Sequence, residues 1–407
     1  MKKKNVLLVI RKGQPELDWI TPLLFKMRSS LNIHIFFSSE KILPKIEKNP
    51  NYIILKQITK KIFWPKKLEN LFWKILSKFL RIFHINISST LKTFIYKKIN
   101  NIENLKKNIG LNGEFDVVFT EYGNNSSWMK ALFEYKKKPL IFNYPSSPLC
   151  FFQRKGGEDG RKFYRKKLIC DYVFLISQYD FNYWSKSISK EKMLSVGHPG
   201  YDKWWLDKLF QNKKKEISKQ KKLILFAYNS DFGLIPKKKE KYLENDLKIF
   251  MKTFTSTEQL RDVKVIFKIH PFRNNKKYLE ILNNFNKNYW EISSEPLIFL
   301  ASKVDAIISS FDSSALLDGL YAKKPSIEFF RSYYDGINYP KISQNKVSGV
   351  SVSLNKGNIN TLLIEALFDK KNIKWKKQLT RFKRIYSTNS DNSSKACKII
   401  NKKIFLI

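Results

Sequence analysis

The run from residue 304 to 327 constrains the fold of this chain more than any other stretch. Residues 304–308 form a short, apolar, β-branched run bounded by turn residues, which is typical of a strand buried in a parallel sheet. Asp312, Ser313 and Ser314 then stand where a helix would begin, and a second strand follows a Lys-Lys-Pro break. Because a helix that starts after a parallel strand presents free N–H groups, the pattern predicts an anion site, most often for phosphate. The alternative is that the serines only cap the helix.

A second polar strand end lies upstream, where Phe267, Lys268 and Ile269 lead into His270 and Pro271. The carboxyl ends of parallel strands meet at one edge of a sheet, and ligands of open α/β sheets bind there. Two such ends within one half of the chain therefore predict a ligand crevice. On sequence alone, a structural role for the histidine is an equal alternative.

Length and composition favour a globular protein of two domains, since the chain has 407 residues, of which 43% are hydrophobic and 15% aromatic. No apolar run reaches the length of about 18 residues that a membrane-spanning helix needs. The apolar run near the start ends at Ile10 without a cleavage site, so we interpret it as a first strand. Cys150, Cys170 and Cys397 have neither metal nor disulfide spacing, which fits a reducing cytoplasm.

The formal net charge of +42 allows nucleic acid, an anionic membrane face or an anionic substrate as partner. The lysines are spread along the whole chain, and Asn and Ile are also abundant, so codon bias explains a large share of the charge. No zinc-finger, helix-turn-helix or RNA-binding signature accompanies it, and we expect no specific nucleic-acid partner.

Strands alternate with helical segments along the chain, which predicts α/β domains with doubly wound parallel sheets. We expect domains at 1–205 and 220–385, joined by a lysine-rich linker, and a C-terminal helix at 386–407 that packs back on the first domain. The expected strands are 5–10, 33–37, 52–55, 115–120, 139–143, 171–176, 193–196, 223–227, 263–269, 289–292, 304–308 and the segment after Pro325.

The segment from about 57 to 108 differs from its surroundings, because aromatic residues alternate with lysines and apolar residues recur at helical spacing. It is predicted to be a helical insertion in the first domain. Packing against the sheet is the slightly favoured interpretation. Contact with an anionic membrane face is the other, with aromatic rings in the interface and lysines on the lipid headgroups.

Four segments in matching order carry a resemblance to a known family: 170–177 through 196–202, 222–228, His270-Pro271 and 309–314. Together they resemble bacterial GT-B-fold transferases of surface polymers. The pattern is similar to that of the CDP-glycerol glycerophosphotransferases of teichoic acid synthesis, and to CMP-sugar capsule transferases with HP and SS motifs. The resemblance covers roughly 115–400 and implies two Rossmann-like domains facing a cleft. One departure is Gly200, where the family usually has Arg.

The resemblance also implies roles for individual residues. His270, with Pro271 beside it, would contact a phosphate or the departing nucleotide, and Glu328 would lie near the ribose or base. Donor phosphates would be held by Ser310, Ser313 and Ser314. The residues expected at the cleft or hinge are Gly197, His198, Pro199 and Asp202.

A second departure concerns the catalytic base, because the family usually places a histidine in an H-G-type turn of the first domain. The matching segment here, 143–147, has none. Glu121 follows a predicted strand, and the resemblance makes it the candidate base, since related sialyl-type transferases use an acidic residue of the N-terminal domain. A carboxylate can do this work if burial raises its pKa towards the working pH. Two alternatives stay open: Glu121 is a solvated loop residue, or the chain has lost its base.

We therefore expect a cytoplasmic enzyme, peripheral on the inner membrane face, that moves a sugar or polyol phosphate from a CMP- or CDP-linked donor to a glycan or lipid-linked acceptor. No cofactor is needed beyond the nucleotide-activated donor, and no metal is implied because no Asp-x-Asp motif precedes a plausible pocket. One alternative is an enzyme related to UDP-sugar 2-epimerases. Another is a catalytically weak relative that binds lipid or polymer.

Overall fold

The structure is a computed structural model, and it places part of the chain well enough for description. The described residues are 2–11, 13–38, 42–63, 79, 115–122, 139–145, 170–185, 188–210, 221–228, 240–269, 276–309, 313–329, 350–353, 356–369, 371–386 and 391–405. Most of the predicted insertion and the Gly-rich loop at 153–162 lie outside them.

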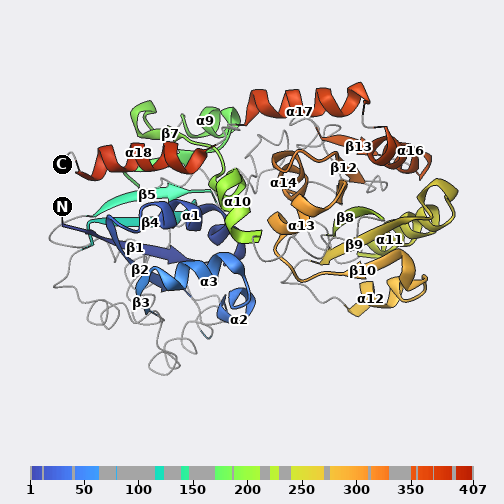
Figure 1. Cartoon of the computed structure of the whole chain (residues 1–407), viewed down its shortest axis with the longest axis horizontal. Coiled ribbons are helices and arrows are strands. Elements are labelled where there is room, and N and C mark those ends of the chain that lie inside the picture. The colour runs from blue at the N-terminus through green and yellow to red at the C-terminus, as the bar shows by residue number, and fades with distance from the viewer. Residues whose placement is uncertain are drawn as a thin grey trace.

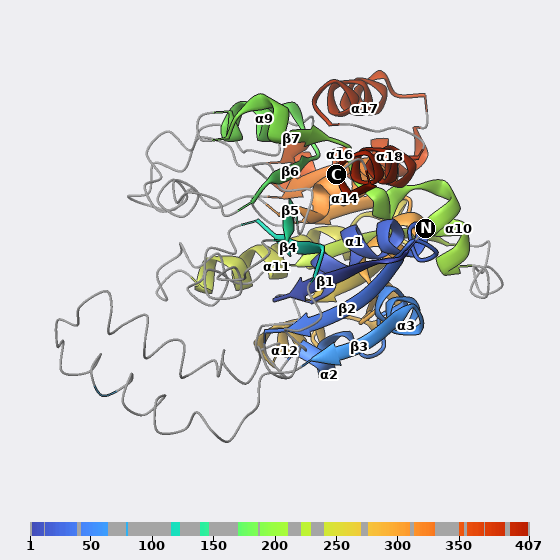
Figure 2. The ribbon, with the colours of Figure 1, turned by 90° about the vertical axis from the view of Figure 1, so that its left-hand side faces the viewer.

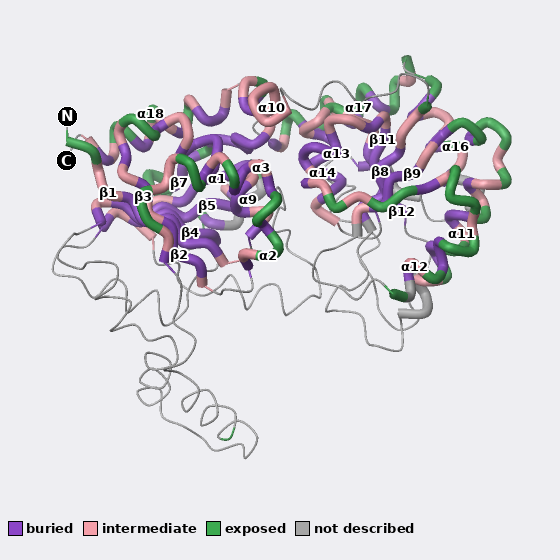
Figure 3. Tube along the Cα trace, turned by 60° about the horizontal axis from the view of Figure 1, so that its bottom comes forward, coloured by how far each residue is buried: buried purple, intermediate pink, exposed green. Residues whose placement is uncertain are grey.

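The first sheet has seven parallel strands, and the central ones are almost completely buried (Figures 1 and 3). In spatial order they are β3 (Thr59–Phe63), β2 (Leu31–Phe37), β1 (Lys4–Ile10), β4 (Val117–Glu121), β5 (Leu140–Tyr144), β6 (Tyr172–Leu175) and β7 (Met193–Ser195). Because β1 lies between β2 and β4, the order reverses direction there, and the chain leaving β1 reaches the carboxyl edge where α/β sheets bind ligands.

The second sheet has six strands, all paired in parallel. In spatial order they are β10 (Trp290–Ile292), β9 (Val263–Ile269), β8 (Lys222–Tyr228), β11 (Ala306–Ser309), β12 (Ser326–Phe329) and β13 (Ser351–Ser353). β11 pairs with β8 on one side and β12 on the other, so the run at 304–327 supplies two central strands of this sheet.

Helices cover both faces of each sheet, as a parallel sheet requires. With the first sheet are α1 (Gln14–Lys26), α2 (Leu43–Ile46), α3 (Pro50–Gln57), α9 (Gln178–Trp184), α10 (Lys203–Phe210) and α18 (Asn392–Phe405). With the second are α11 (Glu240–Thr255), α12 (Lys276–Leu282), α13 (Leu297–Lys303), α14 (Ala315–Tyr321), α16 (Lys356–Phe368) and α17 (Ile373–Ile385). Short 3-10 turns are η2 (Lys190–Lys192), η3 (Pro199–Tyr201), η6 (Glu258–Leu260) and η7 (Lys287–Tyr289).

One continuous hydrophobic core joins the two halves. It contains side chains of α1, α3 and α18 on the first sheet and side chains of α13 and α14 on the second. A separate core under α11, α12 and α16 fills the opposite face of the second sheet. The predicted fold class, two Rossmann-like domains in a GT-B arrangement, is confirmed; the domain boundaries stay a prediction.

One predicted strand is wrong, because residues 52–55 belong to the helix α3. The apolar run Tyr-Ile-Ile-Leu suits a buried strand or a helix equally well. The start signal decides between them: Asn49 accepts a hydrogen bond from Asn51 N at 2.8 Å, and Pro50 occupies the first turn. The third strand of the first half is β3 instead. It lies inside the stretch predicted to be a helical insertion, so the insertion cannot begin at 57.

The C-terminal helix returns to the first sheet. After α17, Tyr386 forms an isolated antiparallel bridge with Ser177 of the first half, and α18 then packs against α1. Figures 1 and 2 show α17 and α18 on the same side of the molecule, with α18 beside the first sheet and α17 on the second half. The chain therefore links the two halves twice, once through α10 and once between α17 and α18.

Candidate functional site

The carboxyl edges of the two sheets face each other. Asp18 lies in α1, just after the carboxyl end of β1, and Lys268 is the penultimate residue of β9. The two charges interact across the domain junction, and Asp318 and Tyr201 interact with Asp18 as well. We call Asp18, Tyr201, Lys268 and Asp318 the junction cluster.

Asp18 is held by the start of α3. Asn51 Nδ2 donates to Asp18 Oδ1 at 2.7 Å, and Trp205 Nε1 in turn donates to Asn51 Oδ1 at 3.0 Å. The side chain of Asn49 lies within hydrogen-bonding reach of the same carboxyl group and lowers its pKa. The Asp18 side chain is half-buried, and this support fixes the orientation of the carboxylate.

Burial dominates the electrostatics of this cluster. It raises the pKa of Asp18 to about 7, against Asn51, Lys268 and Asn49, which lower it. It raises the pKa of Asp318 to about 8, although Tyr201 donates a hydrogen bond to that carboxyl group. Burial also lowers the pKa of Lys268, whose Nζ donates to Ser294 O at 3.1 Å. Protonation of these carboxyl groups therefore changes near neutral pH.

Close packing explains the glycine at position 200, where the family usually has arginine. A Cβ atom at Gly200 would lie 2.3 Å from the backbone oxygen of Asp18. Gly197, three residues earlier, has a φ of +95°, which side chains other than glycine rarely adopt. Both glycines let η3 press against α1, so the departure from the family pattern follows from the position of Asp18.

His198 lies at the junction as a neutral, structural side chain. It is 2% exposed, and burial lowers its pKa to about 3, so it carries no charge near pH 7. Its ring centroid lies 5.0 Å from that of Tyr201 and 5.5 Å from that of Tyr321. Tyr201 stacks on Tyr321 at 4.9 Å. These rings join η3 of the first half to the end of α14 in the second.

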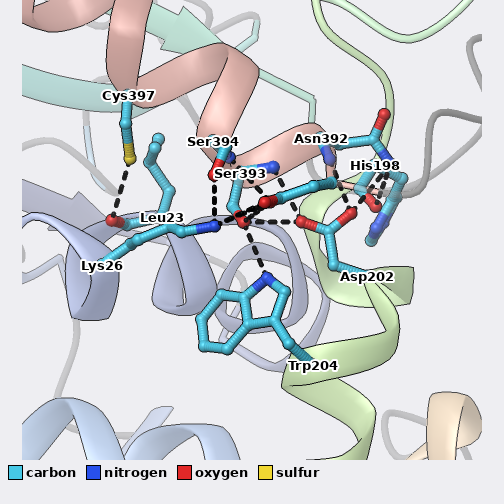
Figure 4. A network of polar contacts seen from close by, with 10 residues as sticks. Leu23, Lys26, His198, Asp202, Trp204, Asn392, Ser393, Ser394 and Cys397 are labelled. Carbon is cyan, nitrogen blue, oxygen red and sulfur yellow. Dashed lines mark hydrogen bonds and ion pairs between the residues drawn. The ribbon is translucent and has the colours of Figure 1, made fainter.

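Asp202 caps the C-terminal helix (Figure 4). Its Oδ1 accepts from Asn392 N at 2.8 Å, and its Oδ2 accepts from Ser393 N at 2.7 Å and Ser393 Oγ at 2.6 Å. Lys26 Nζ pairs with Asp391 Oδ1 at 2.7 Å and also contacts Ser394. We call this set the C-terminal clamp: Lys26, Asp202, Asp391, Asn392, Ser393 and Ser394.

The residues predicted to hold the donor lie partly in the described structure. Ser313 and Ser314 precede α14; Ser313 Oγ accepts from Ala315 N at 3.3 Å, whereas Ser314 makes no side-chain cap. Glu328 is fully buried in β12, opposite Ser309 of β11. His270, Pro271 and Ser310 lie outside the described residues. The donor-binding roles of all these residues stay a prediction.

Glu121, the predicted base, is the last residue of β4 and is only 3% exposed. It is opposite Tyr144 of β5, and both Glu121 and Glu16 raise the pKa of the Tyr144 hydroxyl, after burial itself. The solvated-loop alternative does not describe it. Its catalytic role stays a prediction.

Sequence reasoning missed Asp18 and gave Lys268 no role of its own. In the sequence, Asp18 has the pattern of a polar position in an amphipathic helix, and Lys268 is one lysine among many. The local signal is position, since Lys268 is the penultimate residue of β9 and Asp18 lies in the helix that follows β1. Their interaction arises from the placement of one domain against the other.

Two facing domains with parallel sheets, joined by a double chain crossing, define the GT-B class. Residues 150–339 match the sequence profile of the CDP-glycerol:poly(glycerophosphate) glycerophosphotransferase family. The resemblance and the enzyme class predicted from the motifs, a GT-B transferase that uses a nucleotide-activated donor, are therefore supported. No curated protein sequence matches the chain.

Solved structures share the fold at low sequence identity. A putative UDP-N-acetylglucosamine 2-epimerase from Listeria monocytogenes has a TM-score of 0.64 at 12% identity, with 100% of this chain and 98% of that chain covered. For the wall teichoic acid polymerase TagF, in crystals soaked with CDPG, the TM-score is 0.58 at 14% identity, with 100% and 90% covered. For a UDP-GlcNAc 2-epimerase from Neisseria meningitidis the TM-score is 0.60 at 14% identity, with 99% of this chain and 100% of that chain covered.

Proposed function

We propose that the chain transfers a sugar or polyol phosphate from a CMP- or CDP-linked donor to a cell-surface glycan or a lipid-linked acceptor. The match of residues 150–339 to the glycerophosphotransferase profile carries this proposal, because that range spans the junction and most of the second sheet. The donor nucleotide binds the second domain and the acceptor binds the first. Ser310, Ser313, Ser314, Glu328, His270 and Pro271 are the candidate donor contacts.

Lys268 is the cation that we assign to the donor phosphates. A transferase that expels a nucleoside phosphate must stabilise the negative charge that grows on it, and a preorganised, partly desolvated cation does so efficiently. Lys268 is half-buried at the carboxyl end of β9, and its charge already interacts with Asp18 and Glu295. A donor pyrophosphate at this edge would take over those interactions.

Lys264 provides a matched control for Lys268 on the same strand. It lies four residues earlier, near the amino end of β9, where its Nζ pairs with Glu291 Oε2 at 2.6 Å. We expect Lys268→Ala to weaken the binding of CDP by about tenfold, as loss of a charge-assisted hydrogen bond does. Lys264→Ala keeps wild-type binding.

Ligand-observed NMR with CMP, CDP, UDP and GDP tests the donor class. The proposal predicts that cytidine nucleotides bind, and that Lys268→Ala and His270→Ala weaken that binding. Equal binding of all four nucleotides that is lost at modest salt would contradict it. Turnover of a UDP-sugar without any acceptor would instead favour the epimerase class.

Peripheral association with an anionic inner membrane face is part of the proposal. The exposed residues of α17 include Lys374, Lys376, Lys377, Arg381, Lys383 and Arg384, and this helix has no acidic residue. Ile373, at its start, is 64% exposed. Such a face is suited to anionic headgroups. No helix in the described ranges has the length and apolarity to cross a bilayer.

A further inference from the structure

Two carboxylates of the first domain lie at the carboxyl edge of its sheet, and they differ in access to the junction. Glu121 is 3% exposed, within the sheet and against Tyr144. Asp18 is half-buried in the helix after β1, and its charge interacts with Lys268 of the opposite domain. The interaction of Asp18 with Lys268 therefore reaches from the first domain to the second.

The support of Asp18 resembles that of a positioned side chain rather than a solvated one. Asn51 donates to Oδ1, and Asn51 is itself 1% exposed and fixed by Trp205 Nε1 and by Asn49. The backbone of Asp18 is pressed against Gly200. A carboxylate whose orientation is fixed by hydrogen bonds from rigid neighbours can accept a proton in a defined direction.

We propose that Asp18 is the general base of the transfer reaction, and that Asn51 and Trp205 position it. This inference rests on the proposed function. Asp18 Oδ2 takes the proton of the acceptor hydroxyl while the hydroxyl oxygen of the acceptor bonds to the electrophilic atom of the donor. This atom is phosphorus in a polyol phosphate or the anomeric carbon in a sugar. The bond from that atom to the nucleotide breaks, its electron pair leaves with the nucleoside phosphate beside Lys268, and the proton passes later to solvent.

The protonation equilibrium of Asp18 suits this role. Its pKa of about 7 leaves a large fraction ionised at neutral pH while keeping the carboxylate basic. The ionisable groups that interact with it are Lys268 of β9, Asp318 of α14 and Tyr201 of η3, whereas α3 contributes the uncharged Asn51. Lys268 lowers the pKa of Asp18, and a donor phosphate that engages Lys268 would relieve this effect and make Asp18 a stronger base.

Asp18→Asn is the sharpest variant, because the amide oxygen can still accept from Asn51 while the charge is lost. We expect its transfer rate at pH 7.5 to fall by about 100-fold or more, as loss of a general base does. The wild-type rate should rise through about pH 7, and the variant should lose that dependence. Asn51→Leu should lower the rate less and shift the pH profile. Glu47→Gln, an exposed position on the same domain, should behave as wild type.

Nucleotide affinity gives a second measurement that does not depend on turnover. Asp18→Asn removes the negative charge opposite Lys268, so it should tighten CDP binding by roughly threefold to tenfold at pH 8 and hardly at all at pH 5.5.

Glu121→Gln, measured in parallel, distinguishes the role of Glu121 from that of Asp18. Wild-type transfer by Asp18→Asn, with transfer lost in Glu121→Gln, overturns the inference in favour of Glu121. Unchanged CDP affinity of Asp18→Asn at pH 8 overturns the placement at the donor phosphates. If wild type binds no nucleotide, the proposed function fails first and this inference fails with it.

Discussion

The C-terminal clamp and the junction cluster are both built around buried aspartates, and they satisfy those aspartates to different degrees. Asp202 in the clamp accepts from the backbone and side chains of Asn392 and Ser393. Asp18 in the junction cluster accepts from Asn51, has Asn49 beside it, and otherwise faces ionisable groups. A fully satisfied polar network fixes one structure, whereas a partly satisfied one costs stability and is worth keeping where chemistry needs it.

The pKa values separate Asp391 from the junction cluster. Burial acts on Asp391 as well, but Lys26 and Ser394 hold its pKa well below the usual range. Burial raises the pKa of Asp202, although Ser393 and Asn392 lower it, and burial also raises the pKa of both Asp18 and Asp318. The ion pair of Asp391 with Lys26 therefore stays ionised at every physiological pH, while Asp18 and Asp318 titrate within that range.

The largest effect on stability should follow from Asp202→Ala in the clamp. Without the carboxylate, the N–H groups of Asn392 and Ser393 lose their acceptor at a buried helix start. We expect the free energy of unfolding to fall by about 3 kcal/mol. Urea denaturation measures it, and amide exchange over 391–405 should accelerate. Lys203→Ala, an exposed neighbour, is the control; unchanged protection of α18 would refute a clamping role.

Asp18→Asn should change stability in the opposite direction. The unfolded carboxyl group ionises near pH 3.8 and the folded one near 7, so the folded state is penalised increasingly as pH rises through that window. The amide removes the penalty. We expect the variant to be more stable by about 2 kcal/mol at pH 8, allowing for partial exposure, with the gain fading towards pH 4. Equal pH dependence in both proteins would show that burial does not raise this pKa.

Tyr201→Phe tests the hydrogen bond between Tyr201 and Asp318 in the junction cluster. The Tyr201 hydroxyl donates to Asp318, which is 8% exposed. Its loss should lower the free energy of unfolding by about 1 kcal/mol. The effect should be clearest above pH 8, where Asp318 is ionised. Tyr172→Phe serves for comparison, since that hydroxyl makes no hydrogen bond with the described residues. A loss identical in the two variants would contradict the pairing.

Lys26→Ala should have the smallest effect, even though its ion pair with Asp391 is short. The side chains are 31% and 43% exposed, so water screens the pair. We expect a loss of about 0.5 kcal/mol, reduced further in high salt. Thermal unfolding at two salt concentrations measures this. A loss as large as that of Asp202→Ala would mean that the ion pair, rather than the carboxylate cap, holds α18.

The sequence predicted the two α/β halves because local sequence signals mark most of the strands. The run 263–269 is bounded by turn residues, and the structure has β9 there as predicted. The strand prediction for residues 52–55 was wrong because a four-residue apolar run shows no periodicity, and only Asn49 and Pro50 signal the start of the helix. The cap cluster at 391–394 was visible, but the side chain that caps it, Asp202, comes from 190 residues away.

By itself, then, the sequence determined two parallel sheets with polar strand ends and a family resemblance over roughly residues 115–400. Hydrophobic periodicity and turn chemistry act over a few residues, so both can be recognised in the sequence alone. Only the tertiary structure decided which carboxylate faces Lys268, why position 200 is glycine, and which buried aspartates are satisfied. These depend on the distance between residues far apart in the chain and on the water that their packing excludes. No local pattern encodes either.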